Sequence, residues 1–161
     1  MTVQVSVVTV FEAGTNGGNP APVALVADGM STEDMRGVAV RYGHESAFVL
    51  QPQTGAHDFR FRFFVPNHEM EMCGHATLGA LWLLRRTGRW QSATARIETL
   101  SGTVDAVFDA DTQRIHVGQP AGETAAVDNA ALLATLLDVL GVDSDALLPL
   151  AVLNARTSRV K

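Results

Sequence analysis

The sequence predicts an α+β domain, and three of its segments carry that prediction. Residues 3–11 are rich in valine and threonine, which is typical of a β-strand. Residues 58–65 alternate phenylalanine with arginine, and this is the period of a strand. Residues 77–86 are apolar nearly all round, which predicts a buried helix. The chain has 161 residues, enough for one domain with a hydrophobic core.

The N-terminal part of the chain predicts two strands and a helix. A loop rich in glycine and asparagine, 12–22, follows the first strand and leads to a short apolar strand at 23–26. A helix is predicted to begin at Ser31, because Asp34 stands three residues later, as in a capping box. Gly43 is expected to end this helix.

The middle of the chain predicts two more strands and the buried helix. A strand is predicted at 46–50, before the alternating strand 58–65, in which Arg60 and Arg62 are expected on a face open to water. The helix 77–86 ends in two arginines, which are favourable at a helix C-terminus.

The C-terminal part predicts a strand meander and one further helix. A helix is expected at 130–140, closed by Gly141, and residues 151–160 are either a last strand or a linker. The strands of the meander are predicted at 95–99, 102–108 and 114–117.

Composition excludes several classes of protein. The net charge of −5 argues against a nucleic-acid binder, which would need a basic face. The single cysteine excludes an internal disulfide and favours a reducing, cytoplasmic location. Residues 1–11 lack the basic start of a signal peptide, and no apolar run approaches the length of a membrane span, so no membrane partner is expected.

The segment 69–79 is the most informative of the chain, because Cys73, Gly74 and His75 stand where an apolar helix is about to begin. A helix start offers free backbone N–H groups and a positive dipole end, so it can hold an anion. It is also a place where a thiol readily becomes a thiolate. The alternatives are a buried core cysteine, a structural histidine and a plain N-cap by Thr77.

Four segments, taken in order, resemble the N-terminal half of PhzF-like isomerases, which belong to the diaminopimelate epimerase superfamily. The resemblance covers most of residues 3–120. The segments are Gly18-Asn19-Pro20-Ala21, the Tyr-Gly-His-Glu-Ser-Ala-Phe-Val run at 42–49, Arg-Phe-Phe-Val-Pro at 62–66 and the segment 69–79.

The resemblance implies a fold and a domain organisation. The family has two similar lobes, each a mixed β-sheet curled around a central helix, with the active site between them. The helix 77–86 would be that central helix, and residues 1–161 would form one N-terminal lobe, with the second lobe absent from this chain.

The resemblance also implies an activity and its residues. The chain would belong to an isomerase, free of cofactor and metal, that moves a proton between carbons of a small carboxylate, in specialised metabolism. Glu45 would be the acid and base, and His75 would assist. A substrate carboxylate would be held by Gly74, Ala76 and Thr77, and Asn19 would either bind substrate or hold a turn.

Several alternatives stay open. Cys73 could be one base of an amino-acid epimerase or racemase, whose second base would come from another lobe. The second lobe is expected from a separate polypeptide, as a heterodimer, or else from a second copy of this chain. A non-catalytic binding subunit and a truncated fragment are the remaining possibilities.

Overall fold

The computed structural model describes residues 3–15, 17–119, 124–126, 129–146, 151–153 and 159–160. The chain divides into two compact units, Met1–Pro120 and Ala121–Lys161. The elements of the first unit are β1 Ser6–Val10, β2 Asn19–Ala24, α1 Thr32–Tyr42, β3 Ser46–Leu50, β4 Phe59–Phe64, β5 Glu69–Met70, α2 Gly74–Arg86, β6 Thr94–Thr99, β7 Gly102–Asp109 and β8 Arg114–Val117.

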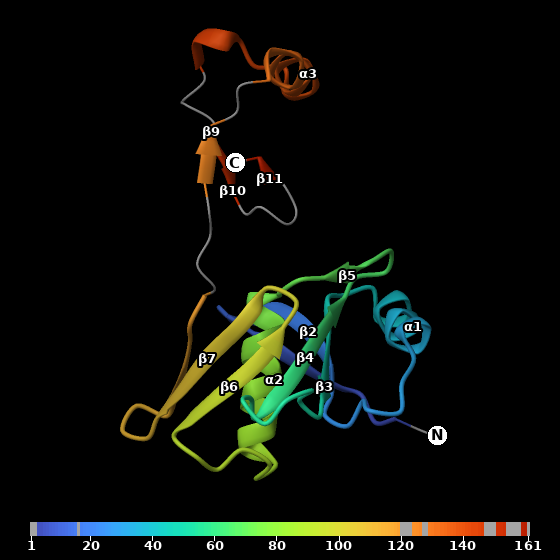
Figure 1. Ribbon diagram of the computed structural model, residues 1–161, viewed down its shortest axis with the longest axis vertical. Helices are drawn as coiled ribbons and strands as arrows, with labels where there is room; N and C mark the ends of the chain where they lie inside the picture. The colour runs from blue at the N-terminus through green and yellow to red at the C-terminus, as the bar shows by residue number, and fades with distance from the viewer. Residues whose placement is uncertain are drawn as a thin grey trace. The chain divides into compact units, whose positions relative to one another are not determined.

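The first unit is a mixed sheet curled around α2, which confirms the predicted fold (Figure 1). The strands follow the order β1-β2-β3-β4-β6-β7-β8, and β5 pairs with β4. The pairs β2/β3 and β4/β6 are parallel, and the other pairs are antiparallel. Among the described strands, β1 and β8 lie at the two ends of this order, and β5 has β4 as its single partner.

The main core lies between α2 and the inner face of the sheet. Gly79 allows the closest approach, since a Cβ atom there would lie 3.4 Å from Val10 Cγ2 and 3.6 Å from the Ala21 Cβ. The prediction that this helix is buried on every side is wrong, because Trp82 is 46% exposed. The helix also begins three residues earlier than predicted, at Gly74.

A second, smaller core packs α1 on the outer face of the sheet. Phe64 of β4 is buried there with Phe48 of β3, their ring centroids 5.7 Å apart in an edge-to-face arrangement. Arg62 lies over the Phe64 ring, 5.0 Å from its centroid, with its side chain only 16% exposed. The expected open face of this strand is therefore largely covered, because α1 packs on it.

The second unit consists of a helix and small strands: β9 Thr124–Ala126, α3 Ala130–Leu140, the 3-10 turn η1 Ser144–Ala146, β10 Ala151–Leu153 and β11 Arg159–Val160. The three strands form an antiparallel sheet in the order β11-β10-β9. The α3 helix begins and ends as the sequence predicts, with Asn129 as N-cap and Gly141 in the left-handed conformation at its C-cap. None of the residues of α3 is buried, although nearly all of them are apolar.

The domain prediction of a single lobe over 1–161 stays a prediction.

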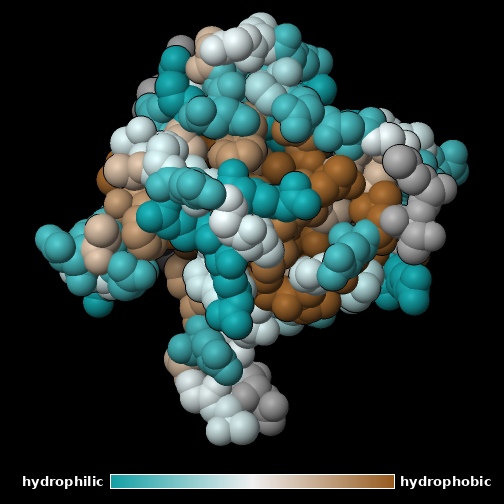
Figure 2. Space-filling view, turned by 90° about the horizontal axis from the view of Figure 1, so that it is seen from below, coloured by the Kyte–Doolittle hydropathy of each residue, from teal (hydrophilic) through white to brown (hydrophobic). Residues whose placement is uncertain are grey.

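Among the described residues, no helix combines the length and the hydropathy that a membrane crossing requires. A view from below that of Figure 1 shows hydrophobic surface exposed between hydrophilic residues (Figure 2).

Candidate functional site

The candidate site lies where β5 leads into α2. β5 is held beside the end of β4, with Phe64 opposite Glu69. Arg62 strengthens this connection, since its Nε and Nη2 donate to the two Glu69 carboxylate oxygens at 2.7 Å each. Because the ion pair is half-buried and bidentate, it fixes the start of the segment that carries Cys73.

Cys73 is the N-cap residue of α2, and it is only 6% exposed. Burial raises the pKa of the Cys73 thiol, and the negative charge of Glu45 raises it further, while the backbone N–H groups of Ala76 and His75 lower it. The sulfur makes no side-chain cap hydrogen bond. The N–H groups of the first turn therefore lie near the thiol and stay available to another acceptor.

His75 lies beside the thiol, with its Nδ1 atom 3.4 Å from Cys73 Sγ. Its other ring nitrogen, Nε2, is buried and has no hydrogen-bond partner among the described residues. An unpaired buried polar atom costs about 1–3 kcal/mol of free energy of unfolding. Whichever nitrogen carries the proton, Nε2 is the one that is left for a ligand.

Glu45 reaches the same site from another part of the chain. Gly43 ends α1 in the left-handed conformation, with φ of 70°, and the chain then turns through Glu45 into β3. The first residue of β3, Ser46, lies opposite Phe64, and Phe64 lies opposite Glu69 on its other side. This register places the half-buried Glu45 at the end of the sheet where α2 begins, within electrostatic reach of Cys73.

The first turn of α2 is open to a ligand at Gly74, where a Cβ atom would meet no other atom within 4 Å. Ala76 and Thr77 are both fully buried. The Thr77 hydroxyl is already used, since it donates to the Cys73 carbonyl oxygen at 2.7 Å. Thr77 therefore lies inside the helix and is not its N-cap, so the hydroxyl stabilises the first turn.

Asn19 is not bonded to the other candidate site residues in the described part of the chain. It is exposed at the first position of β2, opposite Val10. No hydrogen bond or ion pair among the described residues joins it to Glu45, Cys73 or His75. The preceding Gly18 has φ of +89°, and a Cβ atom there would lie 2.7 Å from Thr9 Cγ2, so the loop requires glycine at this position.

The structure thus places three of the predicted residues, Glu45, Cys73 and His75, together at the N-terminus of α2. Sequence reasoning missed the Arg62–Glu69 ion pair, which joins β4 to β5 just before the segment that carries Cys73. The only signal for it was an arginine and a glutamate on either side of a proline turn, and that pattern does not distinguish a buried pair from two solvated charges.

Comparison with known proteins gives a consistent result. A family model described as "Phenazine biosynthesis-like protein" (PhzC-PhzF) matches residues 8–160. The chain is 34% identical over 109 residues to the uncharacterized isomerase YfhB of Bacillus subtilis, a match that covers 66% of this chain and 36% of that protein.

Two solved structures share the fold. One is a PhzF-family phenazine biosynthesis protein of Bacillus anthracis, with a TM-score of 0.71 and 28% identity, over 98% of this chain and 54% of that one. The other is a predicted epimerase of Pseudomonas aeruginosa, with a TM-score of 0.73 and 20% identity, over 94% of this chain and 56% of that one. The chain therefore spans about a third to a half of the length of these relatives.

Proposed function

The chain belongs to the PhzC-PhzF family of phenazine biosynthesis-like proteins, and from this premise we propose that it forms half of an isomerase. The isomerase moves a proton between carbons of a small carboxylate, without a cofactor, in specialised metabolism. The observation that carries the proposal is the meeting of Glu45, His75 and Cys73 at an open helix N-terminus.

In the proposed reaction each group has one role. The N–H groups of the first turn of α2, at Gly74 and its neighbours, hold the substrate carboxylate. Glu45 removes a proton from one substrate carbon and returns it to another, so the carboxylate is regenerated at the end. His75 Nε2 hydrogen-bonds the substrate, which would satisfy the buried nitrogen that has no partner among the described residues.

We place the rest of the active site on a second lobe, contributed by another polypeptide in a heterodimer. The chain matches only part of the length of its relatives. The apolar helix α3 also buries none of its residues, so it presents apolar surface that a partner could cover. The native mass of the chain, alone and co-expressed with the product of the adjacent gene, tests this: a one-to-one complex supports it, and a stable monomer in both cases contradicts it.

The catalytic assignment is tested by deuterium exchange. The wild-type complex in D₂O should incorporate deuterium into one member of a panel of small unsaturated and amino-acid carboxylates, followed by NMR. Glu45→Gln should slow that exchange about 10²–10⁴-fold, because the proton carrier is lost. Glu33→Gln is the matched control, since Glu33 lies on α1 with its side chain 88% exposed. Exchange that survives in the Glu45 variant would exclude this role.

A second candidate activity, amino-acid epimerisation, is favoured by the contact between Cys73 and His75. In that reaction the Cys73 thiolate would be one base, and the other base would come from the second lobe. Cys73→Ser separates the two activities: strongly reduced turnover favours epimerisation with Cys73 as base, and a near-normal rate favours Glu45.

A further inference from the structure

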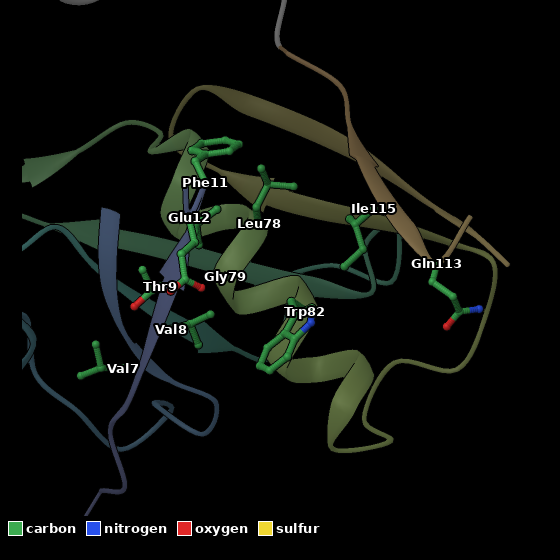
Figure 3. Close-up of a pocket in the computed structure, with 11 residues that line it drawn as sticks. Val7, Val8, Thr9, Phe11, Glu12, Leu78, Gly79, Trp82, Gln113 and Ile115 are labelled. Carbon is green, nitrogen blue, oxygen red and sulfur yellow. The ribbon is translucent and has the colours of Figure 1, made fainter. Parts of the chain in front are cut away.

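His75 lies one turn before Leu78 and Gly79 on the same face of α2. Figure 3 shows Leu78 and Gly79 beside a groove of about 560 Å³, which both of them line. His75 does not line that groove, and Glu12 is the one titratable side chain among the described residues that do. The groups of this helix face that can exchange protons therefore lie at the start of α2 and not in the groove.

The Cys73 side chain is held in place by the first turn of α2. The Cys73 carbonyl oxygen accepts the Thr77 N–H at 2.9 Å and the Thr77 hydroxyl at 2.7 Å. Cys73 is also almost completely buried. Because its backbone and its surroundings both restrain it, the sulfur stays beside the His75 ring, with Sγ 3.4 Å from Nδ1. A thiol at this distance from an imidazole nitrogen can form a hydrogen bond with it.

A hydrogen bond between a thiol and a neutral imidazole has two possible directions. A neutral imidazole carries one ring proton, so one of its nitrogens donates and the other accepts. If the Cys73 thiol donates to Nδ1, the ring proton is on Nε2, and if Nδ1 donates to the sulfur, Nε2 has a lone pair instead. Nε2 is buried and has no partner among the described residues. The contact with Cys73 therefore decides which tautomer His75 adopts.

The surroundings of the sulfur favour donation by the thiol. Burial and the negative charge of Glu45 raise the pKa of the Cys73 thiol, so the sulfur keeps its proton. The backbone N–H groups of Ala76 and His75 lie near the sulfur and lower this pKa, so its lone pairs already face donors. Glu45 acts on the sulfur through its charge, and no hydrogen bond joins the two among the described residues. The acceptor within reach of the Cys73 S–H is the His75 Nδ1 atom.

We propose that Cys73 is a positioning residue for His75: its S–H donates to Nδ1 and holds the ring proton on Nε2. His75 then presents an N–H donor to the site in place of a lone pair. A carboxylate, carbonyl or hydroxyl oxygen can accept from this N–H, whereas an ammonium group cannot. The tautomer is a property of the free chain, and only its use on a substrate oxygen rests on the proposed function.

The tautomer is measured by NMR of the ring nitrogens in the full chain, without ligand and at a pH where the His75 ring is neutral. The signals of this ring are assigned by their loss in His75→Gln. In the wild type the proton should reside on Nε2, and a proton on Nδ1 would overturn the proposal.

Two variants of Cys73 test whether the thiol sets the tautomer. Cys73→Ala removes the donor, so the ratio of the Nε2–H form to the Nδ1–H form should fall about three- to tenfold, as expected for the loss of one hydrogen bond. Cys73→Ser keeps a donor and should restore most of the wild-type ratio. An alanine variant with the wild-type ratio, or a serine variant with the alanine ratio, would overturn the proposal.

His57 is the internal control, because its ring contacts Thr54 and Thr103. Its signals should stay unchanged, so that a shift confined to His75 supports the proposal. Circular dichroism confirms that the variants fold, and Cys73→Val replaces Cys73→Ala if the latter does not. A purely structural Cys73 would alter stability without moving the tautomer, which would overturn the proposal.

Deuterium exchange by the assembled complex separates this inference from the proposed function. If the tautomer follows the expected series and no complex exchanges deuterium into a carboxylate, the proposed function fails and the positioning role stands. If exchange occurs and the tautomer is the same in all variants, the positioning role fails and the proposed function stands.

Discussion

The two helices of the first unit begin in opposite ways. At the start of α1 the Ser31 side chain accepts the Asp34 N–H at 3.1 Å, and the Asp34 carboxylate accepts the Ser31 N–H at 3.0 Å. At the start of α2, Cys73 makes no such bond and the first turn has no acidic residue. A helix start whose own side chains satisfy it is structural, whereas one that lacks them can take an external anion.

The largest effect is expected from making the two starts alike. Gly74→Asp places an acid in the first turn of α2, as in α1, and should weaken acetate binding there about tenfold by charge repulsion. Gly74→Asn is the isosteric control without the charge, and space for either side chain is open at this position. Acetate titrations followed by the amide shifts of His75 and Ala76 measure the effect. Equal affinities in the two variants would show that no anion binds there.

The next effect concerns the stability of the capped start. Ser31→Ala should lower the free energy of unfolding by about 1 kcal/mol, because it removes the side chain that caps α1. Ser31→Thr, which keeps a hydroxyl, should restore most of the loss. Urea unfolding measures both. An alanine variant as stable as the wild type would mean that the capping box contributes nothing here.

A smaller effect is expected on stability in acid, through Asp34 at the start of α1. The Ser31 hydroxyl and N–H hold the pKa of Asp34 below its ordinary value of 3.8. Since this pKa is lowered in the folded state, its contribution to stability is present above the ordinary value and is lost as the pH falls through the lowered one. The stability difference between wild type and Asp34→Asn should therefore be complete at about pH 6 and should shrink steadily as the pH falls below the ordinary value. A difference that persists in acid would contradict the assignment.

The smallest effect is expected on stability in alkali, through Cys73 at the start of α2. Burial raises the pKa of the Cys73 thiol, so the folded chain holds this proton more tightly than the unfolded chain does. Stability from this group is complete below the unfolded pKa and declines as the pH rises from there through the folded value. The midpoint temperature of thermal unfolding should fall more steeply between about pH 7 and about pH 10 for the wild type than for Cys73→Ala, which has no thiol. Parallel curves would show that the thiol has the same pKa in the folded and unfolded states, which would contradict the effect of burial.

Local features were predictable where neighbouring residues decide the conformation. The Ser31–Asp34 box and the Gly43 end of α1 follow from spacing of a few residues, and the structure confirms both. The order of the four motifs also identified the family. The exposed side of α2 was not predictable, because Trp82 has the same apolar character as the buried Leu81 beside it.

The residues of the candidate site also differ in whether local sequence could predict them. The sequence nominated Cys73 and His75 together, because they are neighbours at a helix start, and in the structure the His75 Nδ1 atom lies 3.4 Å from Cys73 Sγ. Glu45 could be nominated only by resemblance. Its proximity to Cys73 depends on the pairing of β3 with β4 and of β4 with β5, which no local pattern reveals.

The sequence by itself determined the strand and helix periods, the cap of α1, the chemistry available at the start of α2 and the family. Tertiary structure alone decided that Phe64 lies in a core under α1 and that Glu45 lies within electrostatic reach of Cys73. The physical reason is that local conformation follows from residues within one or two helical turns. Which faces become buried depends on sheet register and on the curl of the strands around α2.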